Sequence, residues 1–600
     1  MTETSTKTTE STEIPNLEDI NAVLEEASRQ TCNMMENFME NQPAQVRQML
    51  DPLNLTPTML AMTQKIAADP SALLMNQLAF FQDYMKLIQN QSQKMSGSEA
   101  EPVISPAPTD KRFKAEEWSK EAPFDFIKQS YLLASKHMLD TISSIQGLDS
   151  KDARKAEFFT RQFIDAASPS NYLLTNPVAL KETMETGGEN LVKGFNHLLE
   201  DFEREEGMPL LKMVDHNAFE VGKNLATAEG KVVFRNRYLE LIQYAPTTEN
   251  VYTTPIVIFP PWINKFYILD LSEEKSFVRW AVAQGYTVFM VSWVNPDSSY
   301  AEASLDDYLQ EGYLEALHVA QEITGAPSVH TIGYCVAGTM LAATLAYLHA
   351  TGNEKIIKSA TFFTAQVDFE ESGDLSLFVD DEQLKAIDAR MAEKGYLDKR
   401  SMALTFNMLR SNDLIWSYVV NNYLLGKEPM AFDLLYWNCD STNLPRKLHL
   451  QYLKHMYKNN DLVKPGALKL KGVPIDLGTV ETPCYVQAGR EDHIAPAKSV
   501  YKITDHFKGP VRFVLAGSGH IAGVVNPPSA NKYQYWTNDE RVQSLDEFIA
   551  GANETPGSWW GDWHKWLSKR SGKKVTARQP DRGPYPPLCD APGEYVKVKN

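Results

Sequence analysis

The 600-residue chain is short of cysteine, of basic side chains and of long apolar runs, and each shortage narrows its class. Its five cysteines show neither CxxC spacing nor the pattern of a disulfide framework, which favours a reducing cytoplasm. No stretch approaches the roughly 18 to 20 apolar residues of a membrane span, so no transmembrane segment is predicted. The first residues lack the basic-then-apolar signature of a secretory signal, so a cytoplasmic protein is expected.

Basic residues are outnumbered by acidic ones, 59 against 77, and the formal net charge is −18. Such an acidic chain is a poor general binder of nucleic acid. The twelve histidines are scattered without the close pairing of a zinc motif, so no metal site is predicted. No Walker or GxGxxG pattern is present, which leaves no signal for a nucleotide-phosphate loop.

The chain does have enough apolar residues, 43%, for a sizeable core, and its length suggests two domains. A Thr/Glu/Ser-rich tail at 1–14 is predicted to be disordered. A mainly helical N-terminal domain is expected over 15–218, with a linker rich in Pro and Ser near 96–110. An α/β catalytic domain is expected over 219–600. Within it, strand-like sequence gives way to helical and irregular sequence at about 369–475, where we expect an inserted cap.

One helix of the N-terminal domain is predicted to begin at Asp69 and Pro70, as N-cap and first-turn residue. Its apolar side chains fall on one side at helical spacing. These side chains are Leu73, Leu74, Leu78, Phe81, Met85 and Ile88. This face either packs within its own domain or docks another protein or polymer.

Residues 333–338, Gly-Tyr-Cys-Val-Ala-Gly, are the most informative motif because they place Cys335 between small residues. A short apolar run at 328–332 predicts a buried strand before them, and residues 339–347 have the composition of a helix. Strand, tight turn and helix form the nucleophile elbow of α/β hydrolases, in which the helix N-terminus favours a thiolate. The alternative is a buried structural cysteine, the commoner fate of a lone Cys.

Downstream residues complete a triad in the order that α/β hydrolases use: nucleophile, acid, histidine. Asp492 and His520 each come just past a predicted strand, where open α/β sheets collect their ligands. We predict His520 as the base, with His493 as its competitor. Asp492 is the predicted acid, and Glu491 is the alternative.

A further strand-like run at 255–259 opens into a loop that reads Pro-Pro-Trp-Ile-Asn-Lys from residue 260. In this fold the loop after that strand supplies one N–H of the oxyanion hole, and the residue after the nucleophile supplies the other. The predicted donors are therefore Val336 and, from the loop, either Ile263 or Asn264.

Several stretches in matching order carry a family resemblance over roughly residues 105–570. These stretches are 110–133, 260–271, the Cys335 elbow, 432–445, 490–494, 519–523 and the Trp-rich 557–563. Together they resemble the polyhydroxyalkanoate synthases, and the match favours Asp492 as the acid. The family usually has Gly-x-Cys-x-Gly-Gly, whereas this chain has Ala337, which we interpret as a small change of packing.

The resemblance implies a polymerase that joins (R)-3-hydroxyacyl-CoA units into a polyester and releases CoA. Cys335 would carry the acyl group, His520 would deprotonate the thiol and then the 3-hydroxyl, and Asp492 would orient the imidazole. A single chain of 67.7 kDa resembles the class I synthases, which need no second subunit and mainly use short monomers such as 3-hydroxybutyryl-CoA. No cofactor is expected beyond the CoA of the substrate.

The resemblance further implies a homodimer, with the cap covering Cys335 and contributing to the subunit contact. The enzyme is expected in the cytoplasm at the surface of polyester granules, with its N-terminal domain available to granule-associated proteins.

Ala522 is predicted to line the acyl pocket, with Trp262 and Tyr334, and to help set monomer size. Two other classes stay open: a Cys-type thioesterase or hydrolase on the same scaffold, and a non-catalytic granule scaffold.

Overall fold

The computed structural model describes residues 58–59, 62–65, 70–96, 100–145, 147–204 and 211–599, so the tail predicted at 1–14 lies outside the described residues. The chain forms two compact units. The helical unit consists of Met1–Glu200 and Val419–Lys427, and the sheet-containing unit consists of Asp201–Tyr418 and Glu428–Asn600. The helical unit thus includes a short segment from within the region where we expected the cap.

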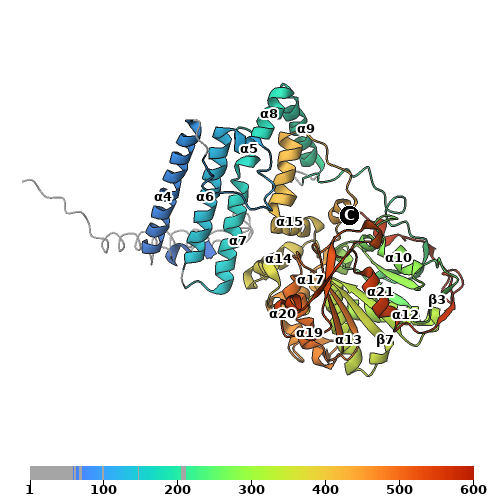
Figure 1. The fold of residues 1–600 in the computed structure, drawn as a ribbon. Coiled ribbons are helices and arrows are strands. Elements are labelled where there is room, and N and C mark those ends of the chain that lie inside the picture. The colour runs from blue at the N-terminus through green and yellow to red at the C-terminus, as the bar shows by residue number, and fades with distance from the viewer. Residues whose placement is uncertain are drawn as a thin grey trace, which may run out of the picture. The chain divides into compact units, whose positions relative to one another are not determined.

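Helices that pack side by side make up the described part of the helical unit, with α6 against both α4 and α7 (Figure 1). Side-chain caps set two of the helix starts: Asp149 accepts two first-turn N–H groups of α7, and Asn176 does the same for α8. The helices are α4 (Pro70–Met95), α5 (Glu117–Lys120), α6 (Ala122–Ser144), α7 (Ser150–Ala166), α8 (Pro177–Glu185) and α9 (Glu189–Arg204).

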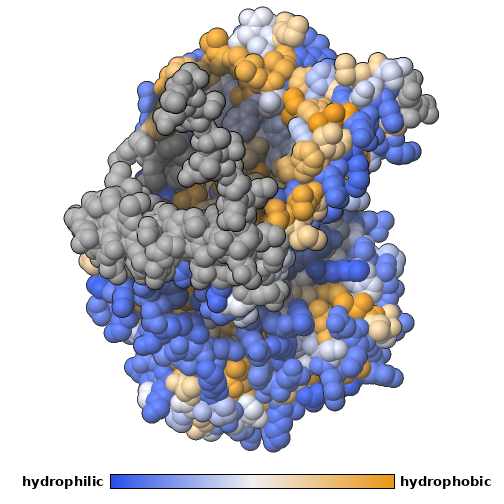
Figure 2. Space-filling view, turned by 90° about the vertical axis from the view of Figure 1, so that its left-hand side faces the viewer, coloured by the Kyte–Doolittle hydropathy of each residue, from blue (hydrophilic) through white to orange (hydrophobic). Residues whose placement is uncertain are grey.

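Helix α4 packs on its neighbours through a different face from the predicted apolar one. Phe80 contacts His137 and Tyr84 contacts Phe126, with ring centroids 5.4 and 6.1 Å apart, and Leu87 is fully buried. The predicted apolar stripe is exposed instead, including Leu74, Leu78, Phe81, Met85 and Ile88. Figure 2, which views the molecule from the α4 side, shows such apolar patches at the surface.

Segment 419–427 lies on α9 and requires a glycine there. A Cβ built on Gly194 would come 1.9 Å from the carbonyl oxygen of Tyr423, so only glycine lets the two backbones approach this closely. The Asn190 amide nitrogen donates to the Leu424 carbonyl at 2.7 Å. The segment contains one π-helical turn, η8 (Val419–Leu424).

An eleven-stranded sheet organises the second unit, in the order β15-β14-β13-β12-β7-β6-β4-β5-β2-β1-β17. The six central strands from β13 to β5 are mutually parallel, and the strands at both edges run antiparallel to their neighbours. The strands are β1 (Gly230–Arg235), β2 (Leu239–Tyr244), β4 (Ile256–Phe259), β5 (Val288–Trp293), β6 (Val329–Tyr334), β7 (Ile357–Phe363), β12 (Cys484–Gly489), β13 (Val511–Ala516), β14 (Gln534–Thr537), β15 (Asn553–Pro556) and β17 (Cys589–Asp590).

Helices cover both faces of this sheet, which explains why β4, β5, β6 and β12 are buried at every position (Figure 1). Val257 and Phe259 of β4 join one buried cluster, with α12 and α13, whereas Ile256 and Ile258 join the other, with α10 and α21. The helices are α10 (Phe277–Ala283), α12 (Glu315–Thr324), α13 (Val336–Ala350), α18 (Ala497–Tyr501), α19 (Ile503–His506), α20 (Leu545–Ala550) and α21 (Trp560–Ser568). None of the described helices has both the length and the apolar character that crossing a membrane requires.

Between β7 and β12 the chain leaves the sheet and forms mainly helices, in the region where we expected a cap. Its helices are α14 (Asp381–Met391), α15 (Lys399–Leu409), α16 (Asp433–Cys439) and α17 (Arg446–Tyr452). A short antiparallel pair, β8 (Tyr396–Leu397) with β9 (Leu444–Pro445), joins the chain after α14 to the chain before α17. A π-helical turn, η9 (Leu453–Lys458), continues α17.

Candidate active site

Cys335 occupies the sharp turn between β6 and α13, with the strained backbone of a nucleophile elbow. Its φ of 55° and ψ of −127° are unfavourable for a residue with a Cβ, and such strain marks functional positions. Gly333 and Gly338 make the turn possible, because a Cβ on Gly333 would lie 2.6 Å from the Gly338 Cα. The thiol is half-buried.

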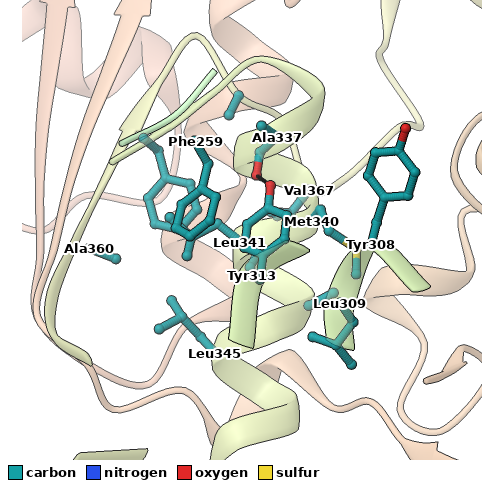
Figure 3. Close-up of a cluster of buried hydrophobic side chains, with 14 of the residues drawn as sticks. Phe259, Tyr308, Leu309, Tyr313, Ala337, Met340, Leu341, Leu345, Ala360 and Val367 are labelled. Carbon is teal, nitrogen blue, oxygen red and sulfur yellow. Dashed lines mark hydrogen bonds between the residues drawn. The ribbon is translucent and has the colours of Figure 1, made fainter. Parts of the chain in front are cut away.

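Ala337, where this chain departs from the expected glycine, fits the core without disturbing the turn. The residue is fully buried, and its carbonyl accepts a 2.6 Å hydrogen bond from the Tyr313 hydroxyl (Figure 3). The Tyr313 ring in turn stacks on Phe259 at a centroid distance of 4.1 Å. A buried tyrosine therefore holds the first turn of α13 in place.

His520 and Asp492 follow neighbouring strands, β13 and β12, and the structure brings them together. His520 Nδ1 lies 2.7 Å from Asp492 Oδ2. Because a carboxylate can only accept, Nδ1 carries the proton of this bond, which leaves Nε2 to face the thiol. The other carboxylate oxygen accepts the N–H groups of Ile494 and Ala495 at 2.8 and 2.9 Å, so the acid is itself held in place.

The electrostatics of this pair favour a charged imidazole. Burial alone would disfavour the imidazolium, but the Asp492 carboxylate and the Cys335 sulfur outweigh it and raise the pKa of His520 to about 10. The competing residues differ from this pattern. Burial lowers the pKa of His493, and Glu491 is exposed, whereas Asp492 is buried.

The predicted oxyanion donors lie on the two elements that flank the elbow. Val336 is the first residue of α13, and N–H groups of a first turn have no intrahelical acceptor. Ile263 and Asn264 follow β4, whose Phe259 is paired with Gly333 at the end of β6. Both loop residues are half-buried, and the Asn264 amide nitrogen has no acceptor among the described residues.

The three predicted pocket residues have different environments. Ala522 is half-buried in the turn that follows His520. Trp262 is buried against Tyr452, with ring centroids 6.0 Å apart. Tyr334 is buried under the histidine loop, where its hydroxyl donates to the His520 carbonyl at 3.1 Å, so it supports that loop from below.

Two tyrosines of the inserted region, which no pattern in the sequence singled out, also approach Cys335. Tyr452 ends α17 and Tyr457 lies in η9, with ring centroids 6.2 Å apart. Burial raises the pKa of Tyr457, and the charges of Cys335 and Asp492 add to this effect. The Gln366 amide nitrogen lies 3.4 Å from the Tyr457 hydroxyl oxygen. The π-helical turn brings residues five apart onto one face, and no sequence pattern announced it.

No group of three or more His, Cys, Asp or Glu side chains within the described ranges is placed to hold a metal ion. The arrangement around Cys335 is that of nucleophilic acyl transfer: a thiol, a base within reach and an acid that orients the base.

Comparison with known proteins identifies two family regions in the chain. Residues 109–281 match the model of the N-terminus of poly-beta-hydroxybutyrate polymerase (PhaC), and residues 259–527 match that of the alpha/beta hydrolase fold. The predicted fold class is therefore confirmed. Among solved structures, the thioesterase domain from the curacin biosynthetic pathway matches with a TM-score of 0.30 and 9% identity, over 50% of this chain and 95% of that domain.

Curated relatives match over almost the whole chain. The poly(3-hydroxyalkanoate) polymerase of Methylorubrum extorquens is 48% identical, covering 91% of this chain and 90% of the relative. The polymerase subunit PhaC of Rhizobium meliloti (strain 1021) is 44% identical, over 91% and 89%. The PhaC subunit of Cupriavidus necator is 42% identical, over 86% and 88%. Similarity of this extent, on a chain whose elbow carries cysteine, shows that the protein belongs to the poly(3-hydroxyalkanoate) polymerase family.

Proposed function

We propose that this chain polymerises (R)-3-hydroxyacyl-CoA thioesters and carries the acyl group on Cys335. The observation that supports this most directly is the buried His520–Asp492 pair beside a strained cysteine elbow, in a chain of the polymerase family. The reaction is an acyl transfer, so the enzyme is an acyltransferase.

In the acylation step, His520 Nε2 takes the proton of the Cys335 thiol. The sulfur then bonds to the thioester carbonyl carbon, and the carbonyl oxygen becomes an oxyanion that accepts from the N–H groups of Val336 and the loop after β4. The bond between this carbon and the CoA sulfur breaks, and CoA leaves as a thiol with the proton that His520 returns. Asp492 stabilises the imidazolium that forms in between.

In the elongation step, His520 removes the proton of a 3-hydroxyl, and the oxygen attacks the acyl group on Cys335. The ester bond forms as the bond to the cysteine sulfur breaks, and the thiol regains the proton. Each proton transfer is assigned to His520, so the scheme calls for no cofactor beyond the CoA of the substrate.

The finer features of the proposal concern the monomer and the assembly. One chain of 67.7 kDa suits a class I enzyme that uses short monomers such as 3-hydroxybutyryl-CoA. The inserted region places Tyr452 and Tyr457 near Cys335, which suits a cap that shields a thioester from water. We further propose a homodimer that works in the cytoplasm at the surface of polyester granules.

The test is to incubate the purified protein with C4 and C8 (R)-3-hydroxyacyl-CoA and to measure CoA release together with polymer yield. We expect CoA release matched by polymer, faster with C4, and neither from Cys335→Ala. CoA release with free hydroxy acid and no polymer would make the protein a thioesterase. No CoA release from a folded protein would make it a non-catalytic scaffold.

A further inference from the structure

The loop that carries the predicted oxyanion donors is held at almost every residue by one segment of the inserted region. The Trp262 carbonyl accepts the Thr442 hydroxyl at 2.6 Å, and the Ile263 carbonyl accepts the Thr442 N–H at 3.3 Å. The Lys265 carbonyl accepts the Trp437 indole N–H at 2.6 Å. These bonds use the carbonyls of the loop and do not occupy the N–H groups of Ile263 and Asn264, the predicted oxyanion donors.

A buried ion pair stands at the centre of this attachment. The Lys265 ammonium lies 2.9 Å from one oxygen of Asp440, and the Tyr267 hydroxyl donates to the other oxygen at 2.9 Å. The Lys265 side chain is only 3% exposed, and that of Asp440 is 12% exposed. Lysine is among the residues that are almost never fully buried unless they are paired, so a lysine in this position depends on its acceptors.

A further acceptor of the Lys265 ammonium belongs to the C-terminal segment of the chain. The ammonium donates to the Val598 carbonyl at 3.1 Å, and the Lys599 ammonium lies 3.3 Å from the hydroxyl of Tyr436 in α16. Segment 594–599 is itself seated on β2, because the Glu240 carboxylate accepts the N–H groups of Glu594 and Tyr595 at 2.9 and 3.0 Å. The C-terminal segment therefore contacts both β2 and the loop next to the elbow.

The side chain of Asn264 independently indicates that this loop binds a ligand. Its side-chain amide nitrogen is buried and has no acceptor among the described residues. A buried donor without a partner is costly, and a substrate oxygen in the site would satisfy it. Lys265 is the next residue in the chain.

We propose that the Lys265–Asp440 ion pair positions the oxyanion donors of this site, and that the segment around Val598 must be seated on it for fast acyl transfer to Cys335. Lys265 touches no reacting atom in this scheme and acts as a positioning residue. The inference rests on the proposed function, because it assumes a tetrahedral oxyanion formed on Cys335. Its consequence is that residues more than 300 positions from the loop are needed for a step at the elbow.

The experiment compares two reactions of the same thiol in the full chain. Acylation by 3-hydroxybutyryl-CoA forms an oxyanion, whereas alkylation of Cys335 by iodoacetamide does not. In Lys265→Met, and in a chain lacking residues 597–600, we expect kcat for CoA release to fall by about 10- to 100-fold, because a misplacement near 1 Å costs on that order. KM should change by less than about twofold, since the loss is confined to the transition state. Alkylation of Cys335, followed by mass spectrometry of its peptide, should stay within about twofold of the parent.

Lys275→Met is the matched control. Lys275 also pairs with the inserted region, through Asp433 at 2.7 Å, but its side chain is 37% exposed and does not touch the donor loop. This variant should keep the parent kcat. If Lys265→Met does not fold, the shortened chain decides the outcome alone.

Two results would overturn the proposal. One is a folded variant with unchanged kcat, and the other is an equal loss of acylation and alkylation, which would make the contact a general support of the unit. A failure of the proposed function itself looks different, because the parent protein would then release no CoA or would release CoA without forming polymer.

Discussion

Gly338→Ala tests whether the position of the elbow controls the rate. The added Cβ would lie 2.3 Å from the Cβ of Ala365 and 2.9 Å from the carbonyl oxygen of Gly333. Ordinary contact begins near 3.4 Å, so α13 must move by about 1 Å, and neither neighbour is a flexible side chain. Overpacking of this kind costs about 1–3 kcal/mol of stability. A displacement near 1 Å at a reacting group costs about 100-fold in rate.

The assay is CoA release from 3-hydroxybutyryl-CoA at saturating substrate, with the melting temperature measured in parallel. Gly561→Ala is the matched control: it lies in α21 with no neighbour in reach of a Cβ, and alanine there favours the helix by up to about 1 kcal/mol. We expect the control to keep full activity and Gly338→Ala to lose about 99% of it while staying folded. A folded Gly338→Ala protein with parent kcat would refute the reasoning.

Three further predictions concern the residues around the elbow. Cys335→Ala should abolish polymer and CoA release with an unchanged melting temperature, while Cys439→Ala should not; near-normal turnover of the first variant would contradict the scheme. His520→Ala should block acylation, whereas Asp492→Asn should still release one CoA slowly and stall in elongation. Since Asp492 helps to raise the pKa of His520 to about 10, its loss lowers that pKa, and the alkaline limit of single-turnover CoA release should move to lower pH. Ser, Gly or Met at Ala522 should change the C4-to-C6 incorporation ratio by roughly 10–200-fold per methylene; identical ratios in active variants would make Ala522 a packing residue.

Much of the sheet and the order of the site residues could be predicted from the sequence, for a definite physical reason. Strands buried on both faces read as continuous apolar runs, and the residue after each run must lie at the carboxyl edge of a parallel sheet. Cys335, Asp492 and His520 all occupy that position, and the structure brings Asp492 and His520 within hydrogen-bond distance. The same logic located the loop of Ile263 and Asn264 beside the elbow.

Features that depend on side-chain direction could not be predicted in this way. Tyr334 ends a strand with two apolar faces, so the sequence does not say whether its ring meets substrate or, as observed, supports His520. Tyr452 and Tyr457 meet only because a π-helical turn changes the helical period. Lys265 reads as a surface lysine until its acceptors, one of them more than 300 residues away, are known.

The exposed apolar stripe on α4 shows a related limit of prediction from the sequence. Helical periodicity correctly grouped Leu74, Leu78 and Phe81 on one face, but it could not tell which face meets α6. Phe80 and Leu87 lie on the face that packs within the unit. Aromatic contacts to α6, such as that of Phe80 with His137, favour burial of this face over the more continuous aliphatic stripe.

Because segment 419–427 packs on α9, the protein cannot be separated into its two units by one cut in the chain. The helical unit is not one continuous stretch of chain, so no single cut yields two complete folding pieces. A shortened chain that starts at residue 201 would keep every strand of the sheet. It would lose the surface of α9 around Gly194 on which this segment lies. Its backbone carbonyls, among them those of Tyr423 and Leu424, would then face solvent in the middle of the inserted region. Limited proteolysis of such a chain should cut first within 419–427, long before the sheet is attacked.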